Sequence, residues 1–480
     1  MSASTQEPGS PKDGQLAVGS LQEFIYGKAP RPVTCGRGVE LGTGTVVPEV
    51  NFTLPPMEIE ESTWPEVRSQ YQEMIDAICQ RAVALEVPAL LVEFETLPPM
   101  TVHPAWGAEI TRLLADVLTE AHSRHGLKSA LRLTPNDSRD HVRPPLMRSG
   151  SYWDGMVELF NIAAESGADL LAIESTGGKE ISDDALMTAD LRTLVFALGV
   201  LAPRDMAFLW KEIVRACRAT GIVPSGDTAC GFANTAMVLA DQKLLPRVFA
   251  AVVRVACVPR SLVAYEQGAV GPSKDCAYEG PYMKAIRGVP ISMEGKSASC
   301  AHLSSVGNIA QAVCDCWSNE SVQNVRLLSA AAPTVSMEQL AYDCRLLNGA
   351  TARSHRQALD LRDLLVDSDA ALDPQAWVLR PDVVLKLSAA IMEESTPYLR
   401  TRRAVLATVA ELRRAHEAQE VRIIPTETRW LDRLSKQADA LPESEEEFTH
   451  EMLETLKDAP YIPAEYGLQV GSWGRGVVRS

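Results

Sequence analysis

The stretch SGDTACGFANT, residues 225–235, decides the fold class of this chain. It follows a short apolar run at 221–224, which indicates a buried strand, and it leads into an apolar segment at 236–240, which indicates a helix. A polar, glycine-containing loop between a strand and a helix is typical of a parallel α/β fold. The loop carries one cysteine, Cys230, whose role depends on the rest of the chain.

The same alternation continues on both sides of this stretch. Apolar runs at 89–92, 129–133, 169–173 and 261–265 predict buried strands, and apolar positions spaced at the helical period lie between them. At least five such strand–helix units lie between about residues 85 and 335. Two weaker strand candidates lie at 289–293 and 322–328. No G-x-G-x-x-G first turn is present. The sequence therefore favours an α/β chain built on a (β/α)8 TIM barrel over a Rossmann sheet.

The predicted barrel spans 63–335 and has further segments at both ends. We expect a disordered tail at 1–20 and a turn-rich N-terminal extension at 21–62, which is punctuated by glycine and proline. Helix-favouring segments at 336–468 predict additional C-terminal helices that pack on the barrel. The last residues, 469–480, are expected to form a flexible tail.

The composition excludes several classes of protein. The chain has 480 residues, 46% hydrophobic and 22% charged, which is ordinary for a globular protein. Its formal net charge of -16 argues against nucleic acid or an anionic membrane as a partner. We find no secretory signal core and no uninterrupted apolar run of membrane-spanning length, and we therefore expect a cytoplasmic protein.

Three residues that can bind a metal ion come after predicted strands. They are Glu174, Cys230 and Cys276, the last of which closes the polar loop GAVGPSKDC at 268–276. In a (β/α)8 barrel the loops after the strands share one mouth. Two thiolates and one carboxylate suit Zn²⁺ and leave one tetrahedral position open, as in catalytic zinc sites.

Packing offers an alternative explanation, because a free cysteine also packs as a small apolar residue. The polar flanks of both cysteines weaken that interpretation without removing it. A competing metal candidate combines Cys314 and Cys316 with the nearby Cys300 and His302. Since the run 306–317 is helix-like, and residues two apart on a helix point to different faces, at least one of that pair is expected to be a core residue.

Five blocks of unusual sequence lie at or near these loops. They are LLAIESTGGKE (170–180), SGDTACGFANTAM (225–237), SLVAYEQGAVGPSKDCAYE (261–279), SMEGKSASCAH (292–302) and CDCWSNESV (314–322). Together they closely resemble the zinc-bearing subunit of methanol:corrinoid (methanol:cobalamin) methyltransferases. The resemblance runs from about residue 40 to about residue 468.

The resemblance implies a TIM barrel with Zn²⁺ held by Glu174, Cys230 and Cys276. It also implies a separate corrinoid carrier protein that docks over the barrel mouth, and a homodimer of this chain at the core of a heterotetramer. The activity that it implies is that of a methanol:corrinoid protein Co-methyltransferase. Such an enzyme activates methanol and transfers its methyl group to the Co(I) corrinoid of the carrier.

Zinc held by two thiolates and a carboxylate is a weak Lewis acid, so a nearby acid would help by protonating the departing oxygen. We take Asp227, Asp275 and Glu95 as candidates, either as proton donors or as residues that orient the zinc ligands, and Lys274 is also placed to orient them. Glu93 and Glu294 are further candidates for the acid. We expect only one of Glu93 and Glu95 to point into the mouth.

Other functions fit the same residues. A corrinoid methyltransferase for another small methyl donor would share the zinc motif. A zinc hydrolase would use the open position to activate water and would need no partner protein. A barrel that serves only as an interaction module would lack stoichiometric zinc.

Overall fold

The computed structural model describes residues 15–301, 303–328 and 330–469. Its main sheet is entirely parallel and has the strand order β7-β6-β5-β4-β3-β9-β8. The strands are β3 (Val47–Thr53), β4 (Ala89–Glu95), β5 (Lys128–Thr134), β6 (Leu170–Ile173), β7 (Val223–Asp227), β8 (Ser292–Glu294) and β9 (Cys316–Val322).

An irregular extended segment at 270–275 closes this sheet into a ring. The Val270 N–H donates to Pro224 O of β7 at 2.9 Å, and Ser273 forms a parallel bridge with Ile291, just before β8. Because β3 pairs with β9, eight extended segments follow one another around the ring in chain order. The predicted (β/α)8 fold is confirmed.

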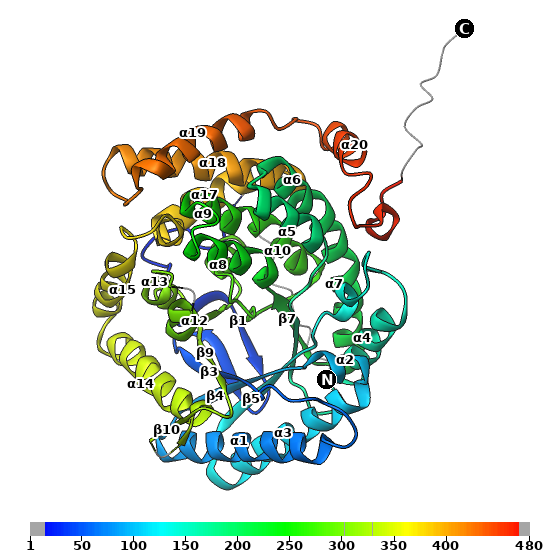
Figure 1. The fold of residues 1–480 in the computed structure, drawn as a ribbon. Helices are drawn as coiled ribbons and strands as arrows, with labels where there is room; N and C mark the ends of the chain where they lie inside the picture. Colours follow the sequence, from blue (N-terminus) through cyan, green and yellow to red (C-terminus); the bar gives the residue numbers. More distant parts are fainter. Residues whose placement is uncertain (1–14, 302, 329, 470–480) are drawn as a thin grey trace, which may run out of the picture.

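A helix follows each extended segment and lies outside the ring, as Figure 1 shows for the strands at the centre and the helices around them. These helices are α1 (Trp64–Ala84), α3 (Pro104–His125), α4 (Ser151–Ile162), α7 (Ala202–Thr220), α10 (Val258–Gln267), α11 (Gly280–Arg287), α13 (Gly307–Gln311) and α14 (Ala332–Arg353). The connections also contain α2 (Pro98–Val102), η1 (Ser138–His141), α5 (Lys179–Thr188), α6 (Leu191–Phe196), η2 (Ala197–Leu201), η3 (Cys230–Asn234), α8 (Thr235–Asp241), α9 (Arg247–Ala256) and α12 (Lys296–Ala301).

Three predicted elements were wrong in type or bounds. The run 261–265 belongs to α10, not to a strand, and the strand-like segment comes after it. The expected helix at 306–317 is shorter, because α13 ends at Gln311. The strand expected at 322–328 lies earlier, because β9 runs from Cys316 to Val322. The run 261–265 is a short apolar run, and periodicity alone does not separate a buried strand from a buried helix in such a run; the run 306–317 mixes apolar and polar residues without a clear period of either kind.

The N-terminal segment contributes to the barrel itself. Strand β3 lies within the stretch expected to be an extension, and it pairs with strands on both of its sides. The antiparallel hairpin of β1 (Lys28–Cys35) and β2 (Val39–Thr43) packs its Leu41 against Leu91 and other floor residues of the ring. Val18 is buried, whereas residues 1–14 of the expected tail lie outside the described residues.

The C-terminal part is helical, as predicted, and its last helices lie along one side of the barrel in Figure 1. It comprises α15 (His355–Asp369), α16 (Pro374–Trp377), α17 (Pro381–Met392), α18 (Pro397–Glu417), α19 (Pro425–Asp439), α20 (Glu445–Thr455) and η4 (Pro463–Tyr466). A small antiparallel pair, β10 (Arg326–Leu327) and β11 (Ala330–Ala331), precedes α14. The expected tail from 470 onward is outside the described residues.

Two helical stretches are long and apolar enough to cross a membrane by length and composition. They are Leu191–Thr220, 83% buried, and Arg247–Gln267, 100% buried. Their apolar surfaces are thus already covered by the rest of the protein, as expected for core helices.

Candidate metal centre

The structure brings the three predicted metal ligands together at the mouth of the barrel. Glu174 directly follows β6, and Cys230 is the first residue of the π-helical turn η3 after β7. Cys276 directly follows the segment that closes the ring. The strand–loop–helix pattern of the sequence therefore places all three at the carboxyl ends of neighbouring strands, where barrel enzymes carry their functional residues.

The three donor atoms are spaced as a zinc ion requires. The two Sγ atoms and a Glu174 oxygen all lie within 4.8 Å of one another, and Cys276 Sγ is 3.5 Å from Glu174 Oε1. Tetrahedral zinc with ordinary bond lengths needs roughly 3.5 Å between sulfur and oxygen ligands and roughly 3.8 Å between two sulfurs. Only small side-chain shifts are needed to bind the ion, so the residues present fit a zinc site.

The pKa values of all three candidate ligands are raised in the metal-free protein, that of Cys276 by its hydrogen bond with Cys230 and by burial. A hydrogen bond from Cys276 lowers the pKa of the Cys230 thiol, but burial and the Glu174 charge outweigh it and raise this pKa to about 11. Burial raises the pKa of Glu174 to about 7, against the opposing effect of Lys274. A bound cation would supply the positive charge that these groups lack.

Lys274 is a buried cation beside this cluster. Its Nζ lies 3.0 Å from Glu174 Oε1 and 2.6 Å from Glu95 Oε2. A third carboxylate, Glu93, has Oε1 at 3.6 Å. Because burial would otherwise disfavour the ammonium, these three acids are what raise its pKa well above the usual value.

Glu95, one of the predicted site residues, therefore lies near the candidate ligand Glu174, because Lys274 contacts both carboxylates. Glu93 reaches the same ammonium and also accepts a hydrogen bond from Thr134 at 2.6 Å. The expectation that only one of the two glutamates points into the mouth was wrong. Residues two apart on a strand share a face, so both point inward.

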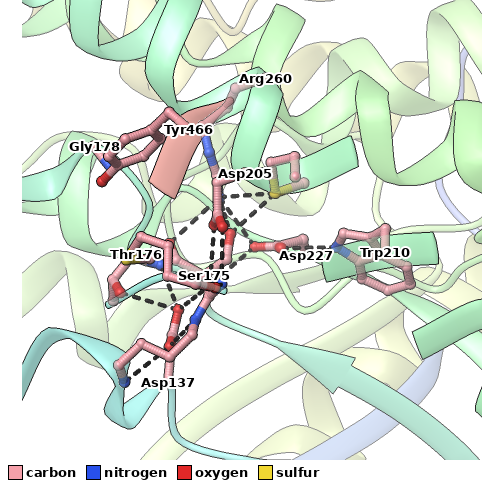
Figure 2. Close-up of polar contacts among 12 residues, drawn as sticks. Asp137, Ser175, Thr176, Gly178, Asp205, Trp210, Asp227, Arg260 and Tyr466 are labelled. Atoms are coloured by element: carbon pink, nitrogen blue, oxygen red, sulfur yellow. Dashed lines mark hydrogen bonds and ion pairs between the residues drawn. The ribbon is translucent and has the colours of Figure 1, made fainter. Parts of the chain in front are cut away.

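Asp227, a second predicted residue, lies in a buried polar network beside the loop that starts at Glu174, here called the metal loop (Figure 2). Its Oδ1 accepts the Ser175 N–H at 3.1 Å and lies 3.3 Å from the Arg260 guanidinium, and its Oδ2 accepts the Trp210 Nε1–H at 2.9 Å. Burial raises the pKa of Asp227, and Arg260 opposes that shift. The carboxylate holds the residue next to Glu174.

Asp275, the third predicted residue, holds its own loop. Its carboxylate accepts the Tyr278 N–H at 2.6 Å and also the Gly280 N–H. Burial and the neighbouring Glu279 raise its pKa well above the usual value. Asp275 therefore shapes the turn that carries Cys276.

Glu294, at the end of β8, is placed differently from the other candidate acids. Its N–H donates to Asp275 O at 3.0 Å, which sets it beside the Cys276 loop. The side chain is 7% exposed, and its carboxyl has no hydrogen-bond or ion-pair partner within the described part of the chain. Burial and the nearby Glu320 raise its pKa well above the usual value.

The competing cysteine cluster does not form a comparable group among the described residues. Cys314 and Cys316 are buried, Cys300 is exposed, and Cys316 packs in the apolar floor of the barrel. His302 lies outside the described residues.

Comparisons with known proteins agree on one family. The family model described as "Methanol-cobalamin methyltransferase B subunit" matches residues 12–467. A methanol–corrinoid protein co-methyltransferase from Methanosarcina barkeri (strain Fusaro / DSM 804) is 35% identical over 458 residues, which are 94% of this chain and 98% of that protein. A chain in the crystal structure of the methanol:cobalamin methyltransferase complex MtaBC from Methanosarcina barkeri is 34% identical. That match has a TM-score of 0.91 and covers 95% of this chain and 99% of that one.

Proposed function

The chain belongs to the family of methanol-cobalamin methyltransferase B subunits, and from this membership we propose that it transfers the methyl group of methanol to the Co(I) corrinoid of a separate carrier protein, with zinc as its metal. The observation that carries the proposal is the convergence of Glu174, Cys230 and Cys276 at the barrel mouth. These three side chains would hold the ion. Zinc, when bound, acts as a Lewis acid that withdraws charge from the methanol oxygen.

The deciding experiment mixes the zinc-loaded chain with a reduced corrinoid protein and a panel of small methyl donors. The cobalt absorption spectrum should change from the Co(I) to the methyl–cobalt form with methanol. A spectrum that changes only with another donor would assign that donor instead. Absence of stoichiometric zinc from the purified protein would reject the metal assignment.

Lys274 reduces the negative charge at the proposed centre. Two thiolates and the Glu174 carboxylate carry one more negative charge than Zn²⁺ neutralises, and the ammonium lies 3.0 Å from that carboxylate. Its second short contact, to Glu95, keeps it pointing at the site. Lys274 thus offsets part of the negative charge that Glu93, Glu95 and the proposed centre bring to the mouth and that would otherwise oppose the approach of a cobalt nucleophile.

We propose that Glu294 protonates the departing methanol oxygen. Hydroxide is a poor leaving group, and a buried neutral carboxyl beside the site can supply a proton. The oxygens of Asp227 and Asp275 are occupied by the donors described above, and Glu95 is paired with Lys274. Burial and the nearby Glu320 charge raise the pKa of Glu294 well above its usual range, against the opposing effect of Lys274, and this raised pKa favours the protonated acid.

Replacing Glu294 by glutamine tests this role, because the amide keeps the shape but cannot supply the proton. The turnover number with methanol should fall by roughly 10²- to 10⁴-fold, while the zinc content stays unchanged. Glu40→Gln, at an exposed position of β2 on the floor side of the barrel, is the control and should retain full activity. Normal turnover in Glu294→Gln would move the proton donor elsewhere.

The proposed reaction also needs an assembly. The resemblance supports a homodimer of this chain as the core of a heterotetramer with two corrinoid proteins. Sedimentation of the purified chain with and without the carrier protein would show whether two copies remain together in both cases.

A further inference from the structure

The loop that carries Glu174 is held at three of the backbone N–H groups that follow it (Figure 2). Ser175 N–H donates to Asp227, and Thr176 N–H donates to Asp137 Oδ2 at 2.8 Å. Gly178 N–H donates to the hydroxyl of Tyr466 at 3.0 Å. The first two acceptors come from the end of strand β7 and from the loop after β5, but Tyr466 lies near the far end of the chain.

Asp137, the acceptor of the Thr176 N–H, is itself held by buried ion pairs. The Arg139 guanidinium lies 2.7 Å from Asp137 Oδ2 and 2.8 Å from Asp205 Oδ1, and all three side chains are buried. A Cβ on Gly177 would collide with the Asp205 carboxylate, so this loop position has room only for glycine. The loop is therefore packed tightly against the network and has little freedom on that side.

Tyr466 reaches the loop because its own segment, η4, is anchored beside it. Glu465 Oε2 accepts the Arg148 N–H at 2.7 Å, and Arg148 lies in the barrel loop that also carries Arg139. The Tyr466 side chain is 1% exposed. The C-terminal segment thus closes over the outer side of the metal loop, with its hydroxyl on Gly178.

We propose that Tyr466 is a positioning residue of the metal centre, which holds the Glu174 loop in the conformation that binds the ion. The inference rests on the proposed zinc site and extends it to the C-terminal segment. Asp227 and Asp137 fix the start of the loop, and Tyr466 fixes its end. With these three hydrogen bonds in place, the Glu174 carboxylate is already oriented for the metal. Binding the ion then costs less conformational entropy.

Tyr466→Phe tests the proposal, because it removes the hydroxyl and keeps the buried ring. Tyr461→Phe is the matched control: Tyr461 lies just before η4, its ring centroid is 6.4 Å from that of Tyr466, and its buried hydroxyl has no hydrogen-bond partner in the described structure. We would measure zinc affinity by competition with a chelator, the absorption spectrum of the Co²⁺-substituted protein, and the melting temperature of the metal-free protein. The wild-type chain and both variants are compared without any carrier protein.

We expect Tyr466→Phe to weaken zinc binding roughly three- to tenfold and to alter the Co²⁺ spectrum. Tyr461→Phe should change neither. Unchanged affinity and spectrum in Tyr466→Phe, with only a lower melting temperature, would make the tyrosine a purely structural residue and overturn the proposal. If the wild-type chain itself binds no zinc, the metal assignment fails, and that result is distinct from a selective effect of the variant.

Discussion

At the scale of single residues, the site depends on charges that the chain brings together from distant positions. Glu174, Cys230 and Cys276 could be predicted because each follows a strand, and the carboxyl ends of barrel strands meet. The ion pairs of Lys274 could not be predicted in this way, because its partner Glu95 comes from β4, in a remote part of the sequence. Tyr466 gives no sequence signal, since an ordinary buried tyrosine looks the same.

On the proposed assignment of Cys276 as a zinc ligand, Cys276→Ser should retain much less zinc than the wild-type chain. A serine hydroxyl is a far poorer zinc ligand than a thiolate, and two protein ligands are too few for a stable site. Elemental analysis of the purified variant measures the loss, and Cys300→Ser serves as control because Cys300 is exposed and away from the cluster. Full zinc content in Cys276→Ser would remove this cysteine from the ligand set.

At the scale of elements, the prediction succeeded where strand and helix differ in length and pattern. The long helices of the barrel and the C-terminal part carry clear helical stripes, as on α7, where Met206, Leu209 and Ile213 are buried. The seventh extended segment has no apolar run, because Pro272, Ser273 and Lys274 occupy it. Its strand-like role comes from pairing with its neighbours in the ring, which the local sequence does not encode.

Glu411 on α18 joins three helices, and its removal should destabilise the C-terminal part. Burial opposes its ionisation, but hydrogen bonds from Arg414, Lys386 and Trp377 lower its pKa from the ordinary 4.5 to about 2. The folded-state pKa lies below the unfolded value, so the stabilisation is complete above about pH 4.5 and is lost as the pH falls toward 2. Glu411→Gln should therefore reduce the free energy of unfolding by about 1–3 kcal/mol at pH 7.

Urea unfolding of wild type and Glu411→Gln at pH 7, 5, 4 and 3 measures this effect. The difference between them should be constant from pH 7 to 5 and shrink below pH 4.5. Glu420→Gln is the control, because Glu420 also contacts Arg414 but is 45% exposed and should matter by less than about 1 kcal/mol. A difference that does not change with pH would mean that packing, not the charge, stabilises this junction.

At the scale of the whole molecule, the barrel interior changes from apolar to charged along its axis. At the floor, the β1–β2 hairpin covers apolar residues of the ring, among them Leu91 and Leu170. Above them, Arg132 Nε pairs with Glu49 Oε1 at 2.9 Å across the interior. The mouth holds the Lys274 cluster and the proposed metal ligands. Stability and chemistry are thus assigned to opposite ends, as in other barrels of this class.

This separation predicts that a cavity in the floor lowers stability without changing the site. Leu41, on β2, is fully buried, and Leu41→Ala should reduce the free energy of unfolding by about 2–5 kcal/mol through lost burial and the cavity left behind. Zinc affinity, measured by chelator competition at a temperature where the variant is folded, should match that of the wild type. Glu40→Ala, exposed on the same strand, should leave both quantities unchanged. A lower zinc affinity in Leu41→Ala would contradict this separation. It would show that the floor and the mouth are energetically coupled, with the hairpin helping to set the geometry of the strand ends at the mouth.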